Sequence, residues 1–209
     1  MTHAVRASTR ALIALTLVMT AGLTGCPFMP DKDNKPPDVP DDFRPRTSPE
    51  NLLYNLKQAY KLRNVAEYES LLAAREPAFT FVLSEDDQQD PGMPDQWGRQ
   101  VEIDIHRNMF DADIVQTLTL DFVPLGQEWD PTDNMWSIMI NNVNLRLYGT
   151  IPGQEGEGPK ELKVEGSTSK FWFREEPWTA PGTSDNIWTI VKWEDNPQGA
   201  LARLKAQQL

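Results

Sequence analysis

The apolar positions of this 209-residue chain follow two different periods, one on each side of residue 110. Between residues 48 and 72, and again between 95 and 110, apolar side chains recur every three or four residues, as on the buried face of a helix. From residue 113 to residue 195 they mostly alternate with polar ones, as in half-buried strands. The pattern therefore predicts helices first and a run of strands afterwards.

Two adjacent helices are predicted at the start of the ordered region. Ser48 suits the N-cap of the first helix, and Pro49 suits its first turn. Asn64, with Glu67 three residues later, has the spacing of a capping box and begins a second, shorter helix. The apolar stripes that follow these caps are Leu53, Leu56 and Tyr60 in the first helix, and Val65, Tyr68, Leu71 and Leu72 in the second.

A strand, a loop and a third helix are predicted next. The segment 78–83 is rich in strand-forming residues, and 84–96 is acidic and contains two prolines, which favours a loop. The third helix is expected from about Asp95 to Phe110, because Trp97, Val101, Ile105 and Met109 lie at steps of four.

Four consecutive strands are predicted at 113–123, 135–149, 161–175 and 186–195, and a last short helix from Asn196 onwards. Consecutive strands with short connections favour an antiparallel sheet, and helices segregated in the sequence pack on one face of it. The expected fold class is therefore α+β, with a curved antiparallel sheet packed against the N-terminal helices.

The second of these strands allows two interpretations. If it is regular, one face turns from apolar to polar along its length, as the mouth of a pocket would require. If a bulge lies at Asn141 and Asn142, Ile138 and Ile140 continue into a second apolar set and Arg146 points to solvent. We favour the bulge because it buries five aliphatic side chains. The regular face would hold Trp136, Ile138, Ile140, Asn142, Asn144, Arg146 and Tyr148, and the bulged one would continue through Val143, Leu145 and Leu147.

The N-terminal 47 residues contain no such pattern. Residues 1–10 hold two arginines and no acid, and 11–23 are apolar but too short to span a membrane, which is typical of a secretory signal. Residues 27–47 hold six prolines and nine charged residues, so we expect a disordered, extended spacer.

Leu23-Thr24-Gly25-Cys26 resembles the lipobox of bacterial lipoproteins, in which the chain is cut before the cysteine and that cysteine is acylated. The resemblance implies a protein of the bacterial cell envelope, anchored through Cys26, and Pro27 favours the outer membrane facing the periplasm. Several acyl chains hold stably to a bilayer. The predicted organisation is a signal peptide (1–25), a lipidated cysteine and spacer (26–47), one domain (48–196) and a C-terminal helix (197–209).

Charge and residue content exclude several functions. The chain from Cys26 onwards has 18 basic and 31 acidic residues, a formal charge of −13, which repels nucleic acid, so no nucleic-acid partner is expected. Its one histidine, His106, excludes a multi-histidine metal site, and neither a cofactor nor a metal is expected. Motifs such as G-x-S-x-G, H-E-x-x-H, the P-loop and C-x-x-C are absent.

The order of elements resembles the nuclear-transport-factor-2-like superfamily. The residues that carry this resemblance are 48–73 leading into 79–84, the segment 97–110, and the aromatic strands 170–175 and 187–196. The resemblance implies a cone-shaped domain with a pocket inside. Members of the superfamily include polyketide cyclases, isomerases, dehydratases and proteins without known chemistry, so the fold alone gives no activity.

A pocket inside such a cone would be lined by Tyr54, Trp97, His106, Trp136 and Ile138. His106 is the candidate acid or base, because an imidazole exchanges protons near neutral pH. The other interpretation is a histidine at a helix edge that hydrogen-bonds a neighbouring strand. Asp104 is no partner for it, because residues two apart on a helix point to different sides.

The functional prediction is a membrane-anchored binding or interaction module whose partner is an unknown small apolar ligand or an envelope protein. One alternative is a small isomerase, cyclase or hydrolase that uses His106 on an apolar substrate. Another is a structural domain that pairs with a second copy through its open sheet face.

Overall fold

The computed structural model describes residues 43–89, 93–151, 154–177, 186–195, 201–206 and 208. These residues belong to one compact unit, Asp41–Leu209. The predicted signal, Cys26 and the spacer up to residue 42 lie outside the described residues. Within the described part of the chain, no helix has the length and apolarity needed to cross a membrane.

The first two helices begin where their caps predict. Helix α2 (Pro49–Leu62) has Ser48 as its N-cap, whose hydroxyl accepts the backbone N–H of Asn51. Helix α3 (Val65–Leu71) has Asn64 as its N-cap, and the Asn64 side chain accepts the backbone N–H of Glu67 at 3.0 Å. Each cap satisfies an N–H that the helix itself leaves unpaired.

The third long helix, α5 (Arg99–Phe110), begins four residues later than predicted. The reason is pairing: β2 (Gln96–Gly98) hydrogen-bonds to β1 (Thr80–Val82), so Trp97 belongs to a strand. Of the four residues expected at steps of four, Trp97, Ile105 and Met109 are buried and Val101 is not, because a helix repeats every 3.6 residues and such a stripe drifts around it. Val101 is 37% exposed. The residues that α5 buries are Glu102, Ile103, Ile105, His106, Met109 and Phe110.

The sheet has six strands in the order β2-β1-β6-β5-β4-β3. The four long strands form an antiparallel meander, as predicted. However, β1 lies parallel to β6, so the sheet as a whole is mixed, a pairing that the order of the strands did not predict. The long strands are β3 (Val115–Asp130), β4 (Met135–Gly149), β5 (Lys160–Pro177) and β6 (Asn186–Asp195).

The bulge expected in β4 is confirmed. Asn142 has φ of 53°, and the pairing of β4 with β5 shifts register between Ile140 and Val143. As a result the apolar face changes phase, and Val143, Leu145 and Leu147 are buried while Arg146 is exposed. The alternative of a regular strand with a polar pocket face is therefore wrong.

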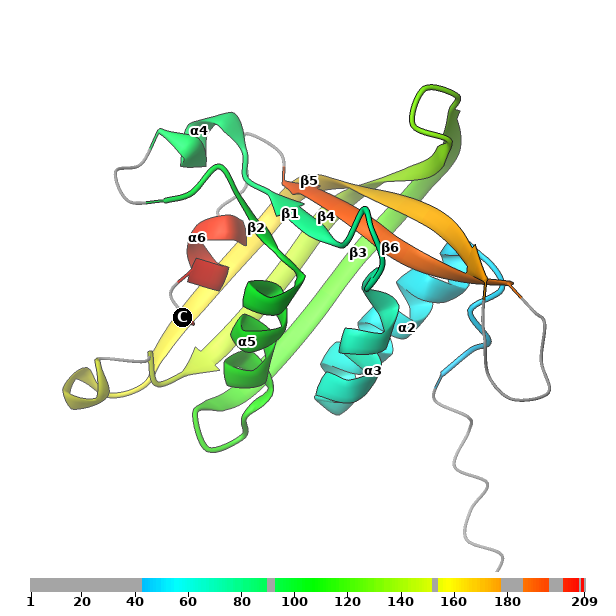
Figure 1. Cartoon of the computed structure of the whole chain (residues 1–209). Helices are drawn as coiled ribbons and strands as arrows, with labels where there is room; N and C mark the ends of the chain where they lie inside the picture. The colour runs from blue at the N-terminus through cyan, green and yellow to red at the C-terminus, as the bar shows by residue number, and fades with distance from the viewer. Residues whose placement is uncertain are drawn as a thin grey trace, which may run out of the picture. The chain divides into compact units, whose positions relative to one another are not determined.

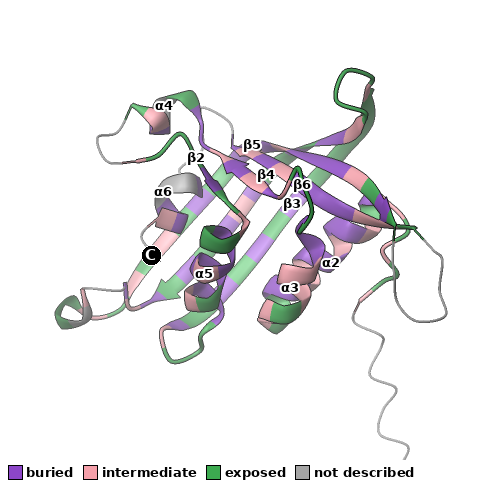
Figure 2. Cartoon of the chain, in the orientation of Figure 1, coloured by how far each residue is buried: buried purple, intermediate pink, exposed green. Residues whose placement is uncertain are grey.

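Helices α2, α3 and α5 lie in front of the curved, unclosed sheet in Figure 1, and the core fills the space between the two layers. Figure 2 shows buried positions alternating with exposed ones along β3 and β4. The fold class is therefore α+β, as the sequence predicts.

Three shorter elements complete the description. Helix α4 (Glu85–Gln88) and the 3-10 turn η1 (Glu155–Glu157) lie in segments expected as loops. Helix α6 (Leu201–Ala206) lies within the predicted C-terminal helix, and its Leu201 and Leu204 belong to the core. Residues 43–47, which the sequence assigned to the spacer, contact the domain: the backbone N–H of Arg44 donates to Asn55 Oδ1 at 2.7 Å.

Candidate functional site

Polar chemistry gathers at two places in the helical layer. One is a set of buried side chains that we call the interior cluster: Tyr60, Tyr68, Trp97, Glu102, His106 and Lys205. The other is a hollow that we call the arginine pocket, with a volume of about 470 Å³, lined by Arg46, Glu69, Ser70, Leu72, Ala74, Arg75, Arg99, Glu176, Pro177, Ile187 and Thr189.

Glu102 is the centre of the interior cluster and has no exposed surface. Its Oε1 accepts hydrogen bonds from the Tyr68 hydroxyl and from Lys205 Nζ, both at 2.6 Å. Its Oε2 accepts from Trp97 Nε1, also at 2.6 Å. Three donors from α3, α6 and β2 therefore converge on one carboxylate from α5, which offsets the cost of removing that charge from water.

His106 lies one helical turn after Glu102 and is also fully buried. Its Nδ1 lies 2.8 Å from the backbone carbonyl of Glu102, so Nδ1 carries the proton, because a carbonyl can only accept. Nε2 then accepts from the Tyr60 hydroxyl at 2.5 Å. The ring stacks on Tyr68 with centroids 3.8 Å apart. Both nitrogens are thus engaged, and no atom of the ring meets solvent.

The charges of the interior cluster are set by burial and by each other. Burial lowers the pKa of His106 to about 4, against the pull of Glu102, so the imidazole is neutral at pH 7. Burial alone would raise the pKa of Glu102, but Lys205 and the hydrogen bonds hold that pKa below its ordinary value. The cluster is therefore a neutral histidine beside a buried ion pair.

The arginine pocket lies where α3 ends. The last carbonyls of a helix lack partners within it, and here arginines supply them. Arg46 donates to the carbonyl of Ser70, and Arg99 donates to the carbonyls of Glu69 at 3.0 Å and Leu72 at 3.4 Å. Two of the three arginines in the pocket thus have a structural role as caps of this helix end.

The acids of the pocket are paired. Glu69 accepts from Arg99 at 3.3 Å, and Glu176 accepts from Arg174, which lies beside the pocket on β5. Burial lowers the pKa of Arg46, while Glu67 and Glu176 oppose that shift. Among the described residues, the exposed guanidinium of Arg75 has no hydrogen-bond or ion-pair partner. The pocket thus carries a positive charge unpaired by any described residue, although the protein as a whole is acidic.

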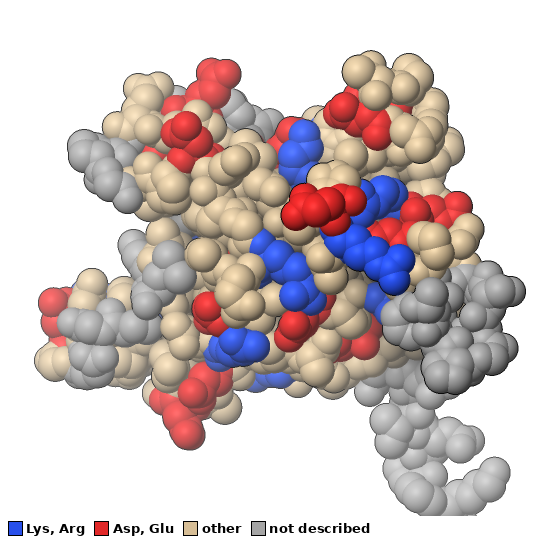
Figure 3. All heavy atoms as spheres, viewed as in Figure 1, with Lys and Arg blue, Asp and Glu red and all other residues tan. Residues whose placement is uncertain are grey.

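The face of the domain drawn in Figure 3 carries basic side chains near its middle, with acidic side chains both between and around them. An anion that approaches this face is attracted by the basic side chains and repelled by the acidic side chains beside them. Such local charge gives directional attraction over about one Debye length, roughly 8 Å at physiological salt.

The five residues predicted to line a pocket lie in different surroundings. Trp97 and His106 both contact Glu102, and Ile138 is 1% exposed in the core. Tyr54 is partly exposed beneath the Arg44 guanidinium, 3.7 Å from its ring centroid, and Trp136 packs on Trp129 at 5.3 Å. None of these five described residues is among those that line the arginine pocket.

Sequence reasoning missed most of the polar groups at both places. Glu102 could have been found, because it lies four residues before His106 and so on the same helix face. Arg46 lies in a proline-rich segment that reads as a spacer, and Lys205 lies in a short helix without other signals. Among the residues that the structure describes, no group of three or more His, Cys, Asp or Glu side chains is placed to hold a metal ion.

Comparisons with known proteins give a likeness of fold. No family model and no curated protein matches the chain. One similar solved structure is a putative calcium/calmodulin-dependent protein kinase type II association domain from Thiobacillus denitrificans, at 15% identity and a TM-score of 0.43, covering 74% of this chain and 97% of that one. Another is a putative dehydratase of the NTF2-like family from Streptomyces avermitilis, at 15% identity and a TM-score of 0.41, covering 70% and 90%.

Proposed function

We propose that the domain is a binding module whose arginine pocket takes a small organic anion with an apolar body. The observation that carries this proposal is the convergence of Arg46, Arg75 and Arg99 on one pocket in a chain of formal charge −11. A guanidinium pairs with carboxylate or phosphate through two parallel hydrogen bonds. The ligand's charged group would contact these arginines.

The rest of the pocket supports a ligand that is partly apolar. Leu72, Ala74, Pro177 and Ile187 contribute apolar surface to its wall. Its volume of about 470 Å³ falls within the range of small-molecule sites, about 300–1,000 Å³. Because Glu69 and Glu176 are paired with Arg99 and Arg174, they repel an incoming anion less than free carboxylates would.

The test is isothermal titration calorimetry of the purified protein with octanoate, with octanol as its neutral counterpart and inorganic phosphate as an anion without an apolar body. We expect octanoate to bind more tightly than either. Arg75→Ala should weaken octanoate binding about tenfold or more, the effect of one lost hydrogen bond to a charged group. The matched control is Arg107→Ala, an exposed arginine of α5 outside the pocket. Equal binding of octanol, or an equal loss in the control, would contradict the proposal.

For the location of the domain, we propose a bacterial envelope lipoprotein with an NTF2-like domain tethered by an acylated Cys26. The support is the lipobox-like segment 23–26 and the proline-rich segment after it. Membrane fractionation after Cys26→Ala tests the anchor. We expect release from membranes or stalled processing, and unchanged retention would count against it.

A second copy of the chain is a further candidate partner. Strand β3 is the last strand of the sheet, and it exposes Val123, Leu125 and Trp129 at 52%, 47% and 44%. An apolar edge strand of this length is a template for pairing with another chain. Analytical ultracentrifugation of the protein and of Trp129→Lys tests this: we expect a dimer that the variant loses.

The enzymatic alternative requires His106 to contact a substrate. In this arrangement both ring nitrogens are occupied and the side chain is fully buried. An acid–base role would therefore require the interior cluster to open. Turnover of an apolar ketone or ester that is lost in His106→Ala while the fold persists would favour this alternative.

A further inference from the structure

Lys205 has no exposed surface, although lysine is among the residues that proteins bury least. Its ammonium nitrogen lies 2.6 Å from Glu102 Oε1. It also lies 3.7 Å from the ring centroid of Trp193 and 4.0 Å from that of Phe81. The ammonium group is thus enclosed by one carboxylate and the faces of two aromatic rings.

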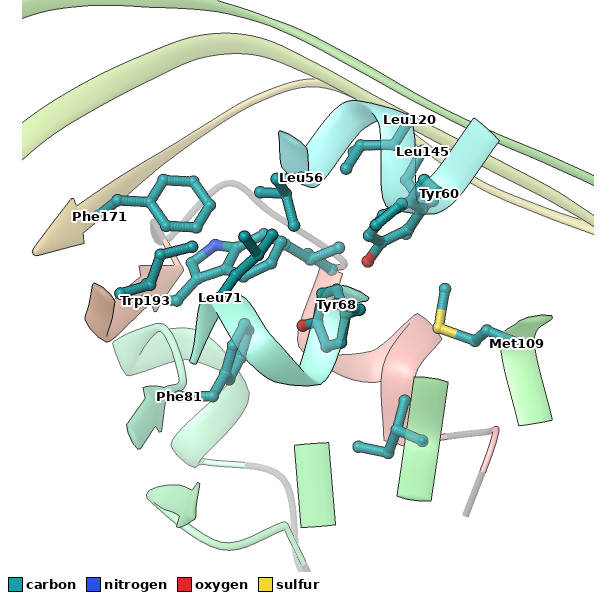
Figure 4. Packing of buried hydrophobic residues seen from close by; sticks show 14 of the residues in the cluster. Leu56, Tyr60, Tyr68, Leu71, Phe81, Met109, Leu120, Leu145, Phe171 and Trp193 are labelled. Atoms are coloured by element: carbon teal, nitrogen blue, oxygen red, sulfur yellow. The ribbon is translucent and has the colours of Figure 1, made fainter. Parts of the chain in front are cut away.

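This combination is the one by which proteins recognise ammonium ligands. A cation is attracted to the electron-rich face of an aromatic ring, most strongly where water is excluded, and a carboxylate supplies the counter-charge. The three contacting groups come from three elements: Glu102 from α5, Trp193 from β6 and Phe81 from β1. Phe81 and Trp193 are among the core side chains labelled in Figure 4.

The carboxylate and the two rings that surround the ammonium group are positioned by residues outside α6. Tyr68 and Trp97 donate to the two oxygens of Glu102 and fix the carboxylate. Trp97 stacks on Phe81 with centroids 4.5 Å apart, and Phe81 lies 5.6 Å from Trp193. Helix α6 therefore contributes the cation to a site whose walls belong to other elements.

We propose that the space around Glu102, Phe81 and Trp193 is a binding site for a primary alkylammonium group, and that the chain's own C-terminal helix occupies it through Lys205. The site is distinct from the arginine pocket, shares no residue with it and takes a ligand of opposite charge. A free alkylamine of about four carbons matches the side chain that now fills it.

The described part of the C-terminal segment buries polar atoms that have no hydrogen-bond partner. This cost favours the replacement of the segment by a ligand. Among the described residues, Gln208 is fully buried and both polar atoms of its side-chain amide lack a hydrogen-bond partner. Each such group carries a desolvation cost without compensation. Burial also lowers the pKa of Lys205, against the opposing pull of Glu102 and Asp195.

The test removes the Lys205 ammonium group by substitution and then supplies a free alkylammonium ion in solution. In the full chain, Lys205→Ala vacates the site, and thermal unfolding is followed with added n-butylammonium chloride. A ligand that binds the folded state alone raises the folding equilibrium constant by a factor of 1 + [L]/Kd, about tenfold at 50 mM for a Kd of about 5 mM. We expect a rising midpoint with butylammonium, a smaller rise with ethylammonium, and none with n-butanol or with NaCl at equal ionic strength.

Two matched variants control the result. Lys205→Met fills the same space with a neutral chain, so butylammonium should not stabilise it. Adding Glu102→Gln to Lys205→Ala removes the counter-charge and should abolish the response. If Lys205→Ala is unfolded without additive, the same titration is followed as recovery of the near-ultraviolet circular dichroism signal. An equal response to butanol, an equal response of the Met variant, or no response to butylammonium at 50 mM would overturn the proposal.

Discussion

The interior cluster and the arginine pocket both place charged side chains among the helices, yet they differ in how completely those charges are used. In the interior cluster, Glu102 accepts three hydrogen bonds and His106 uses both nitrogens. In the arginine pocket, Arg46 and Arg99 give some of their donors to the end of α3, and the exposed Arg75 gives none to a described residue. The polar groups of the interior cluster are therefore buried and paired, whereas the arginine pocket is accessible to solvent and keeps a guanidinium unpaired by any described residue.

This difference separates a structural role from a binding role. A buried ion pair adds little net stability when it forms, but removing one partner strands the other in a medium that cannot solvate it. An exposed guanidinium without partners among the described residues, such as that of Arg75, costs little to maintain and can bind an anion without breaking another hydrogen bond. Substitutions in the two regions should therefore differ in size and in what they affect.

The largest effect is expected for Glu102→Ala. The variant leaves Lys205 as an unpaired buried cation and takes the acceptor from Tyr68 and Trp97. Removing one partner of a buried pair costs about 3–5 kcal/mol in the free energy of unfolding. Urea denaturation measures this, and Glu161→Ala, an exposed acid on β5, is the control.

The double variant Glu102→Gln with Lys205→Met sharpens this result. It removes both charges together and retains most of the volume, so it should cost less than Glu102→Ala alone. A double variant less stable than the single one would mean that the ion pair itself, and not the stranded charge, holds the cluster together.

The second effect concerns pH and follows from the lowered pKa of His106. That pKa is about 4 in the folded protein against 6.5 in the unfolded chain, so between these values the unfolded chain binds the proton and the folded state does not. Stability should therefore fall as the pH falls from about 6.5 to 4, by about 3 kcal/mol over that range at about 1.4 kcal/mol per pH unit. Urea denaturation at a series of pH values measures the slope.

His106→Gln tests whether His106 causes this dependence of stability on pH. A glutamine does not titrate, so the loss of stability between pH 6.5 and 4 should flatten, whatever the stability of the variant at pH 7. Below that range both proteins should lose stability, because protonation of Glu102 breaks its pairing with Lys205. An unchanged slope in His106→Gln would show that other groups carry the acid sensitivity.

The sequence predicts those parts of this fold that depend on local physics. Ser48 and Asn64 cap helices because their side chains reach N–H groups three residues away, and the bulge at Asn142 follows from the phase of the aliphatic residues on each side. The parallel pairing of β1 with β6 depends on where two distant segments meet, and no local pattern encodes that.

The candidate sites show the same limit more strongly. Glu102 was within reach of helical spacing from His106, but its three donors come from Tyr68, Trp97 and Lys205, which are far apart in the chain. Arg46, Arg75 and Arg99 meet because α3 ends where two other segments pass. Such convergence is a property of tertiary packing, so residue types alone could suggest candidates without grouping them.

A smaller effect on stability is expected in the arginine pocket from Arg99→Ala. This variant loses the hydrogen bonds to the carbonyls of Glu69 and Leu72, so the end of α3 loses a cap. The expected cost is about 1–2 kcal/mol, because the freed carbonyls can still reach water at the pocket surface. Urea denaturation beside Arg107→Ala separates this from the loss of an ordinary surface arginine, which should change stability by less than about 0.5 kcal/mol.

The smallest effect on stability, and the one that distinguishes the two regions best, is expected from Arg75→Ala. The Arg75 side chain is exposed and has no described partner, so its removal should change the free energy of unfolding by less than about 0.5 kcal/mol. With saturating octanoate present, however, the stabilisation that the ligand gives should shrink in the variant, because a weaker ligand stabilises the folded state less at the same concentration. A variant equally stable without octanoate and less stabilised with it would place the function of Arg75 in binding. A variant already destabilised without ligand would assign Arg75 a structural role. The charged side chains of the interior cluster and of the arginine pocket would then both serve stability, and the contrast between the two regions would be wrong.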